Sequence, residues 1–171
     1  MRAPRIIVAD RDPAVQQTLS WVLREHGYDV RGVVSCLAAV NAAREFGPDL
    51  MLLDAQLLEE GGAAQLTAFK GDPQWADLPV LVTSTRAPED VVEQALGCGA
   101  TDVVRKPLRS GELLARIGAN LRNRTAFDTT RRQLQSAESA LAQAREEAQT
   151  GRTLMAIMRE VSADLSSEEI Y

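Results

Sequence analysis

Short apolar runs alternate with amphipathic segments through the first 124 residues, and this alternation restricts the fold more than any other feature. The run at 5–10 (RIIVAD) is rich in β-branched residues and ends in an acid, as expected of a strand buried on both faces. Apolar side chains then recur at helical spacing over 14–25, and Gly27 stands where such a helix would end. The same unit repeats, with further strands predicted at 28–34, 49–54, 78–84 and 101–105 and further helices at 37–46, 63–70, 89–98 and from 110 onward.

This order predicts an α/β fold with a parallel, doubly wound sheet. Right-handed crossovers between parallel strands place each connecting helix over one face of the sheet. In such sheets the reacting groups gather beyond the carboxyl ends of the strands. The residues at the ends of the predicted strands are therefore the candidates for function.

Polar residues stand at four of these strand ends. Asp10 and Asp12 follow the first strand, Asp54 ends the third, Ser84 ends the fourth, and Lys106 follows the fifth. Each has an ordinary structural explanation on its own, such as a helix cap at Asp12 or a turn at Lys106. Together they predict carboxylates, a hydroxyl and an ammonium at one edge of the sheet.

Composition and charge argue against several functions. The net charge is −5 and the pI is near 5.0, whereas a nucleic-acid surface normally needs basic residues, so we expect no direct contact with nucleic acid. No apolar run approaches the roughly 18 residues of a membrane span, and the beginning lacks the apolar stretch of a signal peptide. We therefore predict a cytoplasmic protein without membrane contact. Cys36 and Cys98 form no C-x-x-C pair and are expected to be buried free thiols.

The stretch 125–171 is predicted to be one long helix, separate from a domain at 1–124. Ala, Gln, Glu and Arg dominate it, and it contains no proline. The apolar residues follow the three-and-four spacing of a coiled coil, at Leu134, Ala137, Leu141, Ala144 and Ala148. Leu154, Met158, Val161 and Leu165 continue in a different phase, so a break in register is expected at Gly151. A homodimer through this helix is the expectation, and a solitary helix folded back on the domain is the alternative.

Four segments, VADRDP, PDLMLLD, LPVLVTST and GATDVVRKPL, resemble the signature segments of the response-regulator receiver family of two-component signalling. The resemblance covers about residues 4–124 and implies a flavodoxin-like (βα)5 fold with strand order 2-1-3-4-5, and a signalling module rather than an enzyme. It implies that Asp54 accepts a phosphoryl group from a histidine kinase or phosphotransfer protein. Asp10, Asp54 and the backbone carbonyl of Gln56 would hold Mg²⁺, Ser84 would bond the new phosphoryl oxygen, and Lys106 would pair with the acyl phosphate.

Three positions depart from the family pattern. Arg11 stands where the family has a second acid, so we expect weak Mg²⁺ binding and a guanidinium paired with Asp54 or Asp10; Asp12 is a further candidate ligand. Leu58 stands where the family has proline, and Val103 replaces the usual aromatic residue of the fifth strand. A switch based on a rotating aromatic ring is therefore not expected.

Two other interpretations remain open at this point. One is a degenerate receiver that keeps the fold and acts as an interaction module. The other is a phosphatase, because Asp10-Arg11-Asp12 also resembles the D-x-D motif of haloacid-dehalogenase-type enzymes, with Asp10 as nucleophile and Asp12 as acid and base. The final stretch resembles the helix that leads into sensory or output domains, so an effector domain after Tyr171 is an expectation.

Overall fold

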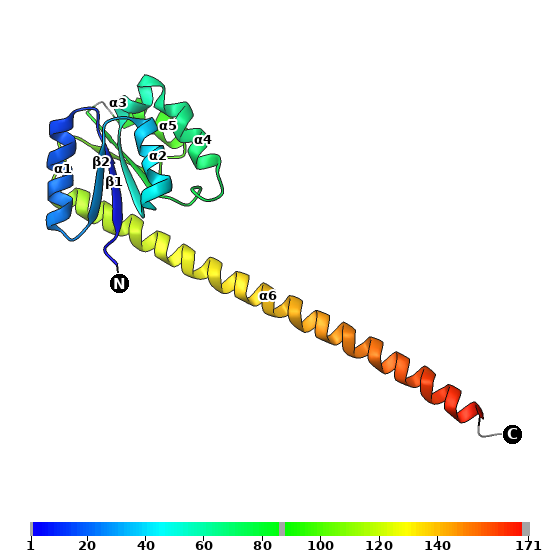
Figure 1. The fold of residues 1–171 in the computed structure, drawn as a ribbon. Coiled ribbons are helices and arrows are strands. Elements are labelled where there is room, and N and C mark those ends of the chain that lie inside the picture. The colour runs from blue at the N-terminus through cyan, green and yellow to red at the C-terminus, as the bar shows by residue number, and fades with distance from the viewer. Residues whose placement is uncertain (1, 86–87, 169–171) are drawn as a thin grey trace. The chain divides into compact units, whose positions relative to one another are not determined.

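The computed structural model describes residues 2–85 and 88–168, without the side chains of 88–90 and 161–168. The chain forms two compact units, Met1–Thr125 and Ala126–Tyr171. In the first unit five parallel strands make one sheet with the order β2-β1-β3-β4-β5 (Figure 1). The strands are β1 (Arg5–Ala9), β2 (Asp29–Val33), β3 (Leu50–Asp54), β4 (Val80–Ser84) and β5 (Asp102–Arg105). The predicted fold class and strand order are confirmed.

The helices begin and end where the local chemistry favours it. The side chain of Asp12 accepts a hydrogen bond from Ala14 N at the start of α1, and Ser35 does the same for α2. Gly47 ends α2 with φ of 60°, a left-handed conformation that costs glycine little. The helices are α1 (Pro13–Glu25), α2 (Cys36–Phe46), α3 (Ala55–Leu57), α4 (Ala63–Gly71), α5 (Pro88–Gly97) and α6 (Ser110–Glu168), and a π-helical turn, η1 (Leu58–Gly62), joins α3 to α4.

Alternate side chains of the strands fill two separate cores, one on each face of the sheet. Ile7, Met51 and Val82 pack with α2, α4 and α5, whereas Ile6 and Leu52 pack with α1 and the first turns of α6. Each fully buried side chain of this size contributes about 1.5–3 kcal/mol relative to exposure. The sheet is thus covered on both faces, which leaves its carboxyl-terminal edge as the place for polar groups.

The segment after Asp54 differs from the sequence expectation. The sequence predicted no helix between the strand at 49–54 and the helix at 63–70, but the chain continues from β3 through α3 and η1 into α4. Gly61 has φ of 94°, so this kink needs a residue that tolerates the left-handed region. The cysteines also differ from each other: Cys36 is buried, with its pKa raised to about 11 by burial, and Cys98 is only partly buried.

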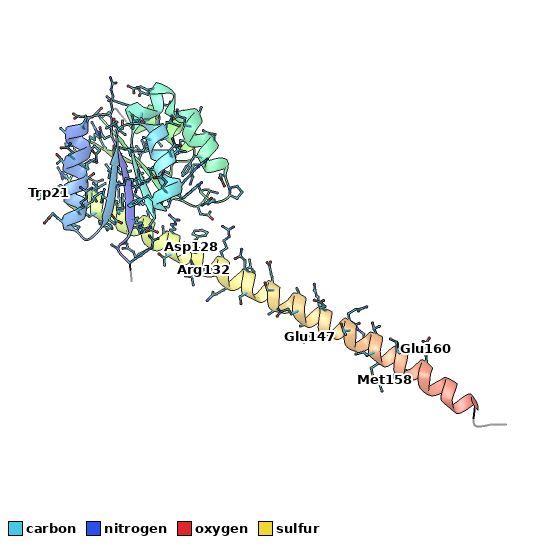
Figure 2. All side chains as sticks on the ribbon, viewed as in Figure 1. Trp21, Asp128, Arg132, Glu147, Met158 and Glu160 are labelled. Carbon is cyan, nitrogen blue, oxygen red and sulfur yellow. The ribbon has the colours of Figure 1, made fainter. Side chains whose placement is uncertain are left out.

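In the second unit α6 runs on as one helix, and Gly151 does not interrupt it. Its apolar side chains are largely exposed, among them Leu134, Leu141 and Met158, and Figure 2 labels Met158 on this helix. Val161 and Leu165, which were assigned to the same repeat, have side chains outside the described part. Over the residues described, no helix combines the length and the apolar character that crossing a bilayer requires.

Candidate functional site

The polar residues predicted from the strand ends meet at the carboxyl-terminal edge of the sheet. Asp10 directly follows β1, and Asp54 and Ser84 are the last residues of β3 and β4. All three are almost completely buried, with 2, 5 and 3% of their surface exposed. The backbone N–H of Lys106 donates to the carbonyl of Ser84 over 2.7 Å, which fixes the lysine beside the serine. The Lys106–Pro107 bond is cis.

Lys106 joins the two buried carboxylates. Its Nζ donates to Oδ2 of Asp10 over 2.8 Å and to Oδ1 of Asp54 over 3.1 Å. The side chains of the three residues are 16, 3 and 6% exposed in the order Lys106, Asp10, Asp54. Such an arrangement compensates one of two neighbouring negative charges and holds both carboxylates in fixed positions.

Burial and charge oppose each other in this cluster. Burial raises the pKa of Asp54 above its ordinary value, although the hydrogen bond and positive charge of Lys106 act against this shift. Burial also acts to lower the pKa of Lys106, but the hydrogen bonds and negative charges of Asp10 and Asp54 outweigh it and raise that pKa overall. The lysine is therefore a permanent cation at neutral pH, placed against the carboxylate of Asp54.

Arg11 does not take the position that we expected. Its guanidinium forms an ion pair with Glu60 in η1, and the two side chains are 63 and 48% exposed. The expectation of a pair with Asp54 or Asp10 was wrong, because Lys106 already occupies that side of both carboxylates. Glu60 was missed by the sequence reasoning, since no strand end or motif marks it.

Asp12 also has a different role from the one considered. Its Oδ1 accepts from Ala14 N over 2.8 Å, and its own backbone N–H donates to Oδ1 of Asp10 over 2.9 Å. Asp12 is thus the N-cap of α1 and orients Asp10 through its backbone. Its side chain is occupied by the cap.

The residues present provide a minimal set of ligands for Mg²⁺. Magnesium is commonly held by one or two carboxylates, with water and phosphate oxygens completing the octahedron. Asp10 and Asp54 supply two carboxylates, and Gln56 lies two residues after Asp54, in α3. No group of three or more acidic, histidine or cysteine side chains suited to a metal occurs among the described residues. The chain therefore fits an ion bound by two carboxylates, without the third acid.

The comparisons with known proteins agree with this fold and show the family of the chain. Residues 6–118 match the family model described as "Response regulator receiver domain", so the chain belongs to the receiver family of response regulators. It is 36% identical over 120 residues to "DNA-binding response regulator MtrA" of Mycolicibacterium smegmatis, covering 69% of this chain and 50% of that protein.

Two further comparisons bear on relatives and on fold. The chain is 34% identical over 119 residues to "DNA-binding dual master transcriptional regulator RpaA" of Synechocystis sp., covering 70% of this chain and 49% of that protein. It spans about half the length of these curated relatives. A CheY-like receiver domain protein from Methanospirillum hungatei JF-1 has a similar fold, with a TM-score of 0.65, 20% identity and coverage of 72% of this chain and 98% of that one.

Membership of this family favours the receiver interpretation over the phosphatase. The phosphatase hypothesis needs Asp12 as acid and base beside Asp10, but Asp12 caps α1. Receiver domains are signalling modules and work as parts of two-component systems.

Proposed function

We propose that Asp54 accepts a phosphoryl group from the phosphohistidine of a histidine kinase or phosphotransfer protein. The observation that carries this proposal is the buried Asp54 carboxylate held at 3.1 Å from the Lys106 ammonium, next to Asp10. A carboxylate is repelled by the oxygens of a phosphoryl group, so transfer depends on fixed positive charge around those oxygens. Lys106 provides that charge in a place determined by two carboxylates.

The transfer forms a bond between a carboxylate oxygen of Asp54 and phosphorus, and breaks the bond between phosphorus and the donor imidazole nitrogen. The Lys106 ammonium pairs with the oxygens of the transferred group, and its other hydrogen bond keeps Asp10 in place. Mg²⁺ held by Asp10, Asp54 and the carbonyl of Gln56 would neutralise further charge on the same oxygens. Because only two carboxylates are available, we propose that this ion binds weakly.

Ser84 is proposed as the residue that senses the modification. It ends the strand next to β3 and is buried beside Lys106. A hydroxyl can donate a hydrogen bond to the oxygens that the phosphoryl group brings. Val103, partly buried on β5, is too small to act as the aromatic switch of the family pattern, so we propose that the signal passes through the backbone between Lys106 and α6, which begins at Ser110.

We further propose that residues 126–168 pair with a second copy of the chain in a parallel coiled coil. The seven-residue spacing from Leu141 through Ala148 continues to Met155, so the expected break at Gly151 is not required. Leu141 and Met155 are 53 and 67% exposed in the single chain. Glu147 and Arg152 are five positions apart and flank this stripe, so in a parallel pair Glu147 would face Arg152 of the partner subunit.

The coiled coil is tested by sedimentation of the full chain and of residues 1–125. A dimer that weakens or dissociates on truncation supports it, whereas equal dimerisation of both forms places the main interface in the first unit. Charge reversal sharpens the test: Glu147→Arg should weaken the dimer, and adding Arg152→Glu should restore it. An antiparallel pair predicts no restoration.

The relatives' names bear on the proposed output. Two of them are named as DNA-binding regulators, which weakens the expectation that the protein has no nucleic-acid partner. For the residues of this chain we propose no direct DNA contact, because a net charge of −5 repels phosphates. An output on DNA is a proposal for a protein that contains this chain.

Phosphorylation is tested by incubating the chain with acetyl phosphate and Mg²⁺ and measuring incorporation by intact mass. We expect one added phosphoryl group, and none in Asp54→Asn. Asp10→Asn is the matched control at the neighbouring carboxylate and should slow incorporation without abolishing it. A folded wild-type protein that remains unmodified would support the degenerate receiver instead.

A further inference from the structure

We propose that Arg11 changes partner when Asp54 is phosphorylated, so that its guanidinium leaves Glu60 and binds the phosphoryl oxygens. The inference rests on the proposed phosphorylation of Asp54. It assigns a positive phosphate-binding role to the position where the family pattern has a second acid.

Arg11 is placed beside the buried cluster by its neighbours in the chain. The backbone N–H of Asp10 donates to the carbonyl of Val33, and that of Asp12 donates to the side chain of Asp10. The backbone on both sides of Arg11 is therefore anchored. Its side chain pairs with Glu60 in η1, so the guanidinium joins the segment that follows β1 to the π-helical turn.

A count of charges shows why the pair should exchange. At rest the two carboxylates and the ammonium sum to −1. A phosphoryl group on Asp54 replaces one carboxylate charge by about two negative charges, so at any given Mg²⁺ occupancy the sum becomes roughly one unit more negative. Lys106 is already shared between Asp10 and Asp54, and Arg11 is the cation next to Asp10 in sequence.

The present partner of Arg11 does not oppose this exchange strongly. An exposed ion pair contributes little to stability, because water screens both charges. A guanidinium can bind phosphate oxygens with two parallel hydrogen bonds, whereas the contact of Arg11 with Glu60 joins one nitrogen to one oxygen. The guanidinium of Arg11 should therefore bind the phosphoryl group in preference to the carboxylate of Glu60.

Two variants that remove the same ion pair test the inference against a purely structural role. Arg11→Gln deletes the guanidinium, whereas Glu60→Gln releases it. Each full-length variant is titrated with beryllofluoride, a phosphoryl analogue, at fixed Mg²⁺, and binding is followed by fluorine NMR. We expect Arg11→Gln to weaken binding about tenfold and Glu60→Gln to strengthen it about threefold.

If the ion pair has only a structural role, the affinity for beryllofluoride should change in the same direction in both variants. That result would overturn the inference, and so would an unchanged affinity in both variants. Arg11→Lys keeps the charge without the bidentate geometry and should bind with intermediate affinity. Melting curves without ligand control for folding, since both glutamine variants should melt alike. If the wild type binds no beryllofluoride at any Mg²⁺ concentration, the proposed phosphorylation of Asp54 fails, and the inference fails with it.

Discussion

Two ionic groups at the same end of the first unit have opposite environments. Lys106 is bound to Asp10 and Asp54 in a cluster whose side chains are at most 16% exposed, whereas Arg11 and Glu60 pair with 63 and 48% of their side chains exposed. Buried charges are costly when a partner is removed, and exposed pairs contribute little. The comparison indicates that the inner cluster is fixed by the fold, while the outer pair is free to rearrange.

The largest effect should follow from removing the buried cation. Lys106→Met leaves two neighbouring carboxylates without compensation, so we expect a loss of about 3–5 kcal/mol in the free energy of unfolding at pH 7. Arg11→Met is the matched control and should cost less than about 1 kcal/mol, because its pair is exposed. Urea denaturation of both variants measures the difference. Equal losses would contradict the contrast between the two groups.

The pH dependence of the free energy of unfolding should reveal the cost of burying the ionised carboxylate of Asp54. Burial raises the pKa of Asp54 in the folded state above its ordinary value of 3.8, so the ionised carboxylate destabilises the fold at neutral pH. As pH falls through the raised pKa, the folded protein takes up a proton before the unfolded chain does, and this penalty disappears.

Asp54→Asn lacks this titration. We therefore expect the variant to be more stable than the wild type at pH 7, with the difference shrinking as pH falls toward 4. Urea denaturation of both proteins across this range measures the difference. A difference in the free energy of unfolding that stays constant over the range would show that burial does not raise the pKa of Asp54.

A smaller effect should show whether Asp12 acts as the N-cap of α1 or as a ligand for Mg²⁺. Asp12→Ala removes the N-cap of α1 and should cost about 1 kcal/mol in the free energy of unfolding. The rate of phosphorylation by acetyl phosphate and its dependence on Mg²⁺ should stay nearly unchanged, because the side chain caps the helix. A large rise in the Mg²⁺ requirement would instead identify Asp12 as a metal ligand.

The sequence predicted the sheet and its polar edge because both depend on local patterns. Strands buried on both faces are continuous apolar runs, and parallel strands bring their last residues to one edge, so Asp54 and Lys106 were placed correctly. The partner of Arg11 was not predictable, because a long side chain reaches several loops and only the fold decides among them. The path through η1 was also missed, since two glycines after two glutamates read as a loop.

Asp54, rather than Asp10, is the proposed acceptor of the phosphoryl group. Both carboxylates are buried and both contact Lys106, so the distinction needs a direct chemical measurement. Reduction of the freshly phosphorylated full-length chain with borohydride converts an aspartyl phosphate to homoserine, which peptide mass spectrometry can locate. We expect homoserine at position 54 and unmodified Asp10. Homoserine at position 10, with Asp54 intact, would contradict the assignment of Asp54 as the acceptor.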